Sequence, residues 1–199
     1  MSGSGSQSDI ERAADAVRDG DLVVYPTETV YGLGADALDP EAVERVFATK
    51  GRDRENPVSM AVPDVETAAE YTELGGRERA FMRQFLPGPV TVVVERGDRL
   101  PDALTAGRDR VGVRVPDHDL ALSLLGRVAP VTATSANASG RPSVRQTSSL
   151  HEQVRRAASV VVDDGETPGG GSTVVDVGRG TVHRRGALAD RVEDWLSDR

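Results

Sequence analysis

Apolar residues recur at helical spacing close to the amino end of the chain. One face of this stretch carries four of them: Ile10, Ala13, Ala14 and Val17. Ser8 and Glu11, at the start of this stretch, have the spacing of a capping box, which satisfies free backbone N–H groups at a helix start. Gly20 follows the last apolar position. The pattern therefore predicts a first helix that ends at Gly20.

A second helix is predicted from Asp39-Pro40-Glu41, because proline suits the first helical position. Its buried stripe consists of Ala42, Val43, Val46 and Phe47. Gly51 ends this helix, so Lys50 is expected on its last turn. Further helices are predicted over residues 64–74, 76–85 and 151–158, and at the carboxyl end around Leu188, Val192, Trp195 and Leu196.

Short apolar runs bounded by turn residues predict the strands. They cover residues 22–25, 90–95, 111–115 and 159–164, the run that begins at 129, and a hairpin of 172–177 with 181–186. In the third run three valines alternate with Gly112 and Arg114, so Arg114 faces away from the valine side. The glycines and hydroxyls of residues 27–36 predict a shaped loop.

Helices and strands alternate irregularly without an internal repeat, which predicts a single α/β domain. A length of 199 residues suits one domain with a sizeable core. The opening "MSGSGSQSD" lacks the basic and apolar regions of a signal peptide. We therefore expect residues 1–8 to be a flexible tail and residues 9–199 to form the domain. No run of about 18 apolar residues exists, so no membrane span is expected.

Charge and composition narrow the possible functions. The chain has 24 basic and 32 acidic residues, a net charge of −8 and a pI near 5.0. This balance argues against broad binding to a nucleic-acid backbone, which needs an extended basic face. The absence of cysteine excludes a disulfide framework, a thiolate nucleophile and a zinc–thiolate site. A cytoplasmic location is the default expectation.

Lysine is nearly absent, since one of the 24 basic residues is Lys50 and the other 23 are arginines. Two explanations are compatible: a GC-rich genome that favours arginine codons, and an acidic surface adapted to salt. Lys50 opens the segment "KGRDREN", whose cations could simply complement a helix C-terminus. However, a shaped loop precedes the helix, and Asn56-Pro57 fixes the exit. A compact charge beside the planar fork of Arg52 suits a polyphosphate.

The segment "TSANASGRPS" offers hydroxyl and amide groups in a loop. Loop-turn chemistry alone could explain it. A serine nucleophile is disfavoured because the G-x-S-x-G elbow is absent. The functional interpretation is that Ser135 and Asn137 point donors at an anionic ligand. The "PGGGST" stretch lacks the lysine of a P-loop, and the single histidine of "DHD" is typical of a turn; His151 and His183 indicate nothing specific.

Taken together, the segments resemble the Sua5/YrdC/YciO family over about residues 10–190. The shared motifs occur in the family's order: "YPTETVYGLGADA", "KGR" with "NP" four residues later, "LPGPVTVVV", "VGVRVP", "TSANASGRPS", "STVVDV" and "RRGAL". The resemblance implies a twisted, open mixed sheet flanked by helices (YrdC/RibB-like), with a large concave cationic cavity. Because no residues remain for the extra domain of longer Sua5 proteins, we expect the short YrdC form.

The resemblance also implies an activity. Family members of this type condense ATP, L-threonine and bicarbonate to threonylcarbamoyl-AMP and release pyrophosphate, with Mg²⁺ accompanying ATP and no metal ligands from protein side chains. A separate threonylcarbamoyl transferase then modifies adenosine 37 of tRNA. The ATP contacts implied are Lys50, Arg52, Asn56, Asn137 and Arg184. The threonine contacts implied are Thr29, Arg114, Ser135 and Ser172. The catalytic set implied is Lys50, Arg52, Ser135 and Asn137.

Three positions depart from the family's usual pattern. Asp53 follows K-G-R where proline is common, and Arg110 stands where a small hydroxyl residue is frequent. The R-P-G motif becomes Arg184-Arg185-Gly186, which leaves open which arginine contacts ATP.

Rival functions remain open at this point. One is an RNA-binding or ribosome-maturation module, against which the acidic pI and 4% aromatic content argue. Another is a YciO-like paralogue with different nucleotide chemistry. A carbamoyl-transfer accessory domain of a hydrogenase-maturation protein is disfavoured, because the chain carries no accompanying domains.

Overall fold

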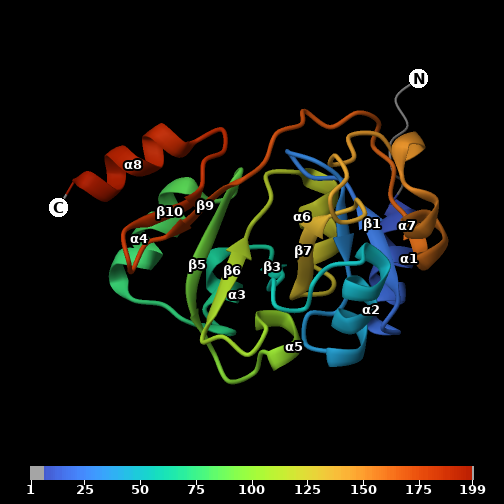
Figure 1. Ribbon diagram of the computed structural model, residues 1–199, viewed down its shortest axis with the longest axis horizontal. Coiled ribbons are helices and arrows are strands. Elements are labelled where there is room, and N and C mark those ends of the chain that lie inside the picture. Colours follow the sequence, from blue (N-terminus) through green and yellow to red (C-terminus); the bar gives the residue numbers. More distant parts are fainter. Residues whose placement is uncertain (1–6, 199) are drawn as a thin grey trace.

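The computed structural model describes residues 7–198 as a mixed α/β fold (Figure 1). The helices are α1 Gln7–Arg18, α2 Pro40–Lys50, α3 Val65–Ala68, α4 Gly76–Phe85, α5 Asp102–Thr105, α6 Asp119–Leu125, α7 Glu152–Ala157 and α8 Ala189–Ser197, with a 3-10 turn at Thr147–Ser149. The strands are β1 Leu22–Tyr25, β2 Gly32–Gly34, β3 Ser59–Ala61, β4 Thr72–Glu73, β5 Val90–Arg96, β6 Arg110–Arg114, β7 Val131–Ser135, β8 Ala158–Val161, β9 Thr173–Asp176 and β10 Thr181–Arg184.

The strands form one open sheet in the order β10-β9-β5-β6-β3-β7-β2-β1-β8, and β4 pairs with β5 at its side. Three pairs are parallel, namely β1–β8, β3–β6 and β5–β9, and the other pairings are antiparallel. This arrangement confirms the predicted mixed open sheet. Within residues 7–198, no helix combines the length and apolarity needed to cross a bilayer.

Helices cover both faces of the sheet at its β1 end. Along β1 the side chains alternate, so Val23 and Tyr25 pack with α1 and α6 while Leu22 and Val24 pack with α2 and α7. In Figure 1, α1, α2 and α7 accordingly gather around β1, far from α4 and α8.

Only one face of the sheet is filled with apolar residues at the β5–β9 end. The valines of that face pack beneath α4 and α8: Val90, Val92, Val94, Val111, Val113 and Val175. Their neighbours in the alternation, which include Thr91, Gly112 and Arg114, point to the opposite side and line a cavity. The prediction that Arg114 faces away from the valines is confirmed. This half-covered sheet is what positions the candidate site.

The strongest local signals predicted their elements correctly. The Asp39 carboxylate accepts a 2.9 Å hydrogen bond from the N–H of Glu41, and α2 ends at Gly51, whose φ of 58° is left-handed. At the amino end α1 spans Gln7–Arg18, so Ser8, the predicted capping residue, lies within the helix. Residues 7 and 8, which were assigned to the tail from the sequence, thus belong to α1, and residues 1–6 lie outside the described part.

Other predictions failed where tertiary pairing decides the outcome. The helix expected over 64–74 ends at Ala68, because Thr72 and Glu73 pair with β5 as strand β4. The loop expected over 27–36 contains strand β2, whose two glycines accommodate the Tyr25 ring: a Cβ at Gly32 or Gly34 would lie 2.9 Å from it. Helices α5 and α6 were not predicted.

Candidate active site

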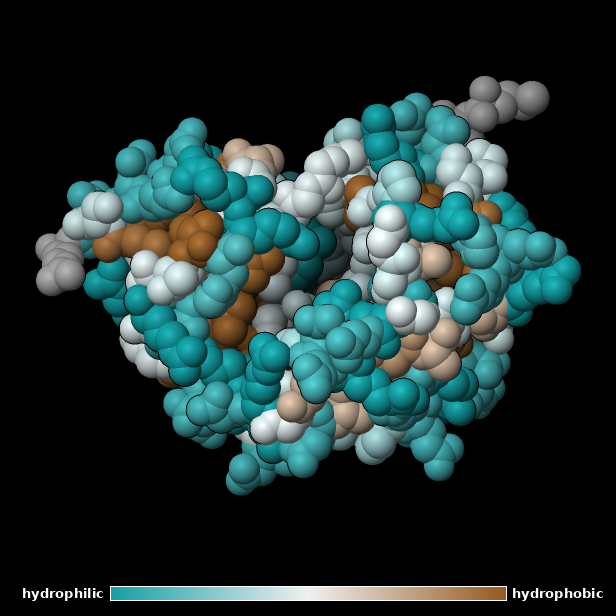
Figure 2. Space-filling model, in the orientation of Figure 1, coloured by the Kyte–Doolittle hydropathy of each residue, from teal (hydrophilic) through white to brown (hydrophobic). Residues whose placement is uncertain are grey.

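A cavity of about 830 Å³ opens over the uncovered face of the sheet. Its volume falls in the range of about 300–1,000 Å³ that is common for small-molecule sites. Strands β5, β6 and β9 form one wall, and the residues around β2 and the end of β7 contribute to the other. Figure 2 shows the molecule hollowed between these two parts.

The cavity lining is cationic although the protein as a whole is acidic. Six arginines contribute to it: Arg52, Arg108, Arg110, Arg114, Arg179 and Arg184. The carboxylates in the lining are Asp109 and Asp176. The expected concave cationic cavity is thereby confirmed, and its charge favours an anionic ligand.

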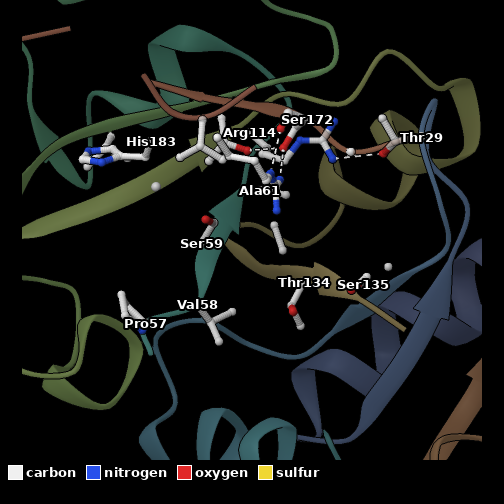
Figure 3. A pocket seen from close by; sticks show the side chains of 18 of the residues that line it. Thr29, Pro57, Val58, Ser59, Ala61, Arg114, Thr134, Ser135, Ser172 and His183 are labelled. Atoms are coloured by element: carbon white, nitrogen blue, oxygen red, sulfur yellow. Dashed lines mark hydrogen bonds between the residues drawn. The ribbon is translucent and has the colours of Figure 1, made fainter. Parts of the chain in front are cut away.

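Thr29, Arg114 and Ser172, the predicted threonine contacts other than Ser135, meet at one wall of the cavity (Figure 3). The guanidinium of Arg114 donates to the Thr29 hydroxyl at 3.4 Å, and a second terminal nitrogen pairs with the Glu28 carboxylate. Both members of this ion pair are largely buried. The Nε of Arg114 and one Glu28 oxygen, Oε2, have no partner. Arg114 is thus held in place, and its Nη1, whose hydrogen bond to Thr29 is long at 3.4 Å, keeps donor capacity for another acceptor.

Ser172 connects this cluster to Arg184. Its hydroxyl lies 2.7 Å from that of Thr91 and accepts a 2.8 Å hydrogen bond from Arg184, whose Nε also donates to the Ser172 carbonyl at 3.0 Å. Burial, and next the nearby charge of Arg114, lower the pKa of Arg184. Two guanidinium groups this close stabilise an anion between them.

The neighbouring Arg185 has different partners. It pairs with Glu193 and Asp190 at the exposed start of α8. Arg184, not Arg185, therefore contributes to the cavity lining.

Arg52 reaches the cavity from the turn after α2. Its guanidinium donates to the backbone carbonyls of Asn56 and Pro57, each at 3.0 Å, and burial lowers its pKa. Asn56 itself is exposed and does not belong to the lining. Its main-chain carbonyl orients Arg52, whereas the predicted nucleotide contact of its side chain stays a prediction.

Lys50 lies behind the cavity wall. The residue is only 3% exposed, and its ammonium donates to the carbonyls of Ser135 and Asn137, the latter at 2.7 Å. Burial, with the charge of Arg52 as a smaller cause, lowers the pKa of Lys50 to about 8. The structure does not place Lys50 in the lining, where a phosphate clamp was expected.

The two predicted residues at and just after the end of β7, Ser135 and Asn137, have different surroundings. Ser135 lines the cavity, and Figure 3 shows it with Thr134 across the hollow from Ser172. The Asn137 amide nitrogen instead donates to the carbonyls of Ala138 and Arg141 at 3.0 and 2.7 Å. Six of the nine predicted site residues thus line one cavity, and Lys50, Asn56 and Asn137 support it from outside.

Several residues of the cavity region were not predicted from the sequence. Asp176 is fully buried at the end of β9 and accepts a 2.7 Å hydrogen bond from Arg110. His183, which the sequence left uninterpreted, also lines the cavity. Glu28 stands next to Thr29 in the "TETVYG" segment, so a charged residue within an otherwise apolar and hydroxyl-rich stretch was the available signal.

The described residues contain no cluster of three or more carboxylate or histidine side chains suited to a metal ion. Of the lining carboxylates, Asp176 is already paired with Arg110.

The chain belongs to the Sua5/YciO/YrdC family, whose profile, described as "telomere recombination", matches residues 15–186. Threonylcarbamoyl-AMP synthase of Pyrococcus abyssi is 40% identical over 171 residues, which cover 84% of this chain and 50% of that protein. Threonylcarbamoyl-AMP synthase of Bacillus subtilis is 35% identical over 161 residues, with 79% and 46% covered.

A solved structure of P. abyssi Sua5 complexed with L-threonine superposes with a TM-score of 0.90 at 37% identity, covering 95% of this chain and 57% of that one. The chain thus spans about half the length of these relatives.

Proposed function

We propose that this protein is an L-threonylcarbamoyladenylate synthase. It joins ATP, L-threonine and bicarbonate into threonylcarbamoyl-AMP and pyrophosphate, a nucleotidyl transfer. The observation that carries the proposal is a single cavity in which the Arg114–Thr29–Ser172 cluster adjoins Arg184, with Arg52 also in its lining. Such a cavity can hold a small amino acid beside a nucleotide.

The amino acid would bind at Arg114. Its carboxylate would accept from the guanidinium of Arg114, and the hydroxyls of Thr29 and Ser172, which line the same cavity, would bind its polar groups. The relative solved with L-threonine supports this choice of amino acid. Binding through the carboxylate leaves the α-amino group free to react.

The first chemical step would form a carbamate. The neutral amine of threonine attacks the carbon of bicarbonate, a C–N bond forms and water leaves, which gives N-carboxythreonine. This carbamate decomposes readily in water, so a sheltered cavity favours its survival.

In the second step a carbamate oxygen would attack the α-phosphorus of ATP. The new P–O bond replaces the bond to the β-phosphate, and pyrophosphate departs with the bonding electrons. Negative charge grows on the phosphate oxygens, and Arg52 and Arg184, whose guanidinium groups are held by backbone carbonyls, would stabilise it. Mg²⁺ would enter with ATP and neutralise part of the triphosphate charge. No protein nucleophile is needed.

The product is a mixed anhydride and would have to be passed to a threonylcarbamoyl transferase that modifies adenosine 37 of tRNA. This role would place the protein in the cytoplasm and bring it to tRNA indirectly.

The test is incubation of the purified protein with ATP, Mg²⁺, ¹³C-bicarbonate and one amino acid at a time, with the products read by mass spectrometry. We expect a labelled adenylate that forms with L-threonine and requires bicarbonate. An adenylate formed without bicarbonate, or none with any amino acid, would refute the proposal. If the protein binds ATP but forms no adenylate with any amino acid, a YciO-like paralogue is favoured. An RNA gel shift that does not change in Arg52 and Arg184 variants would favour the RNA-binding alternative.

A further inference from the structure

Lys50 joins two segments that lie far apart in the sequence. Its ammonium donates to the carbonyls of Ser135 and Asn137, and its own carbonyl accepts from the N–H of Ser139 at 2.8 Å. A single residue at the end of α2 therefore contacts the last residue of β7, Ser135, and two residues of the loop that follows it, Asn137 and Ser139.

At its start this segment is held by strand pairing: Ser135, the last residue of β7, pairs with Gly32 of β2, and the N–H of Ala136 donates to the Tyr31 carbonyl. Further along, the Asn137 amide nitrogen donates to carbonyls of the loop itself. Beyond Ala136, Lys50 is the main link from the loop to the rest of the fold. Burying an ammonium group costs free energy unless it donates hydrogen bonds. The Lys50 ammonium and the two carbonyls therefore hold one another in position.

Lysine suits this place better than arginine. Both acceptors are backbone carbonyls two residues apart, and the compact ammonium donates to both from one nitrogen. The planar guanidinium of arginine is larger and places its donors in a fixed fork. In an otherwise arginine-based protein, this geometry gives a reason for the single lysine.

We propose that Lys50 is a positioning residue: it holds the 135–139 loop so that Ser135 faces the cavity, and it does not itself bind the phosphates. The catalytic role of this loop rests on the proposed function, whereas the contacts between Lys50 and the loop do not depend on it. Arg52, two residues further along, is the cation of this motif that lines the cavity.

The first experiment measures hydrogen exchange of the ligand-free protein. Lys50→Met keeps most of the side-chain length but has no donor, and Lys50→Arg keeps the charge. In both we expect exchange of the Ser139 and Arg141 amides to rise by about tenfold, since charge-assisted hydrogen bonds are lost. The matched control is Arg54→Gln, which removes an exposed cation paired with Glu44 and should leave these amides unchanged. Wild-type exchange in Lys50→Met would overturn the proposal.

The second experiment separates positioning from phosphate binding. For Lys50→Met we expect pyrophosphate release at saturating ATP to fall at least about tenfold, while the Kd for ATP stays within about threefold. Lys50→Arg should not restore turnover. A large rise in Kd with unchanged loop exchange would identify Lys50 as a phosphate ligand instead.

A third experiment uses the wild-type chain and is decisive even if the variants do not fold. Because Lys50 is the only lysine, an amine-reactive reagent can be followed at one internal peptide by mass spectrometry. We expect slow labelling of Lys50 with or without Mg-ATP. Rapid labelling that Mg-ATP blocks would contradict the proposal. Neither exchange nor labelling needs catalysis, so this inference and the proposed function can fail separately.

Discussion

The buried ion pair between Arg114 and Glu28 allows binding and folding to be tested apart. Their side chains are 12% and 13% exposed, so Arg114→Met would leave a carboxylate in a largely dry place without its counter-charge. Removing one partner of a buried pair costs about 3–5 kcal/mol, whereas replacing both charges is often nearly neutral. We therefore expect Arg114→Met to lose about 3–5 kcal/mol of unfolding free energy and the double variant Glu28→Gln/Arg114→Met to regain most of it.

Threonine binding should respond differently from stability. A hydrogen bond to a charged group contributes about 1.5–3 kcal/mol, which corresponds to an affinity loss of roughly 10- to 150-fold. This loss should occur in the single and the double variant alike, because both lack the guanidinium. Urea denaturation measures the stability and isothermal titration calorimetry with L-threonine measures the Kd.

The double variant tests whether Arg114 binds the carboxylate of threonine. If it is as stable as the wild-type protein and still binds L-threonine with the wild-type Kd, Arg114 is not the carboxylate site. If Arg114→Met has the unfolding free energy of the wild-type protein, the ion pair does not stabilise the fold as its burial indicates.

Three further predictions follow from individual groups. Selective ¹³C labelling of Lys50, the only lysine, should show a pKa near 8, and a pKa at 10.5 would contradict this. Between pH 8 and 10.5 the folded chain then binds fewer protons than the unfolded chain. The unfolding free energy of the wild type relative to Lys50→Met should therefore rise across that window by up to about 1.4 kcal/mol per pH unit. Arg184→Gln should weaken ATP binding about tenfold or more in a calorimetric titration while Arg185→Gln, whose arginine pairs with α8, should not; equal effects would refute the assignment. If the net charge of −8 is a salt adaptation, Tm should rise with molar KCl, and a Tm that does not change with salt leaves codon usage as the explanation.

Sequence patterns predicted correctly the helices and strands whose formation is determined by residues close together in the sequence. The cap at Asp39, Pro40 and the left-handed Gly51 determine α2 without help from distant parts of the chain. Strand β4 and the short α3 could not be predicted in this way, because β5, which pairs with β4, lies more than 15 residues further along. The same holds for β2, whose glycines are needed where Tyr25 and Val131 approach.

The candidate site shows the same division. Residue types and motifs identified the cationic groups, and Arg52, Arg114 and Arg184 do line one cavity. What the motifs could not show is the direction of each side chain. Lys50 points to carbonyls 85 and 87 residues away, and this orientation arises only when α2 docks beside the end of β7. Glu28 was overlooked because its importance comes from Arg114, which lies 86 residues further along the chain.

The most direct test of the account is a crystal structure of the protein with L-threonine and a non-hydrolysable ATP analogue. We predict phosphate oxygens within hydrogen-bonding distance of Arg52 and Arg184, the threonine carboxylate on Arg114, and the Lys50 ammonium still on its two carbonyls. A nucleotide bound outside this cavity, or threonine bound away from Arg114, would contradict the account.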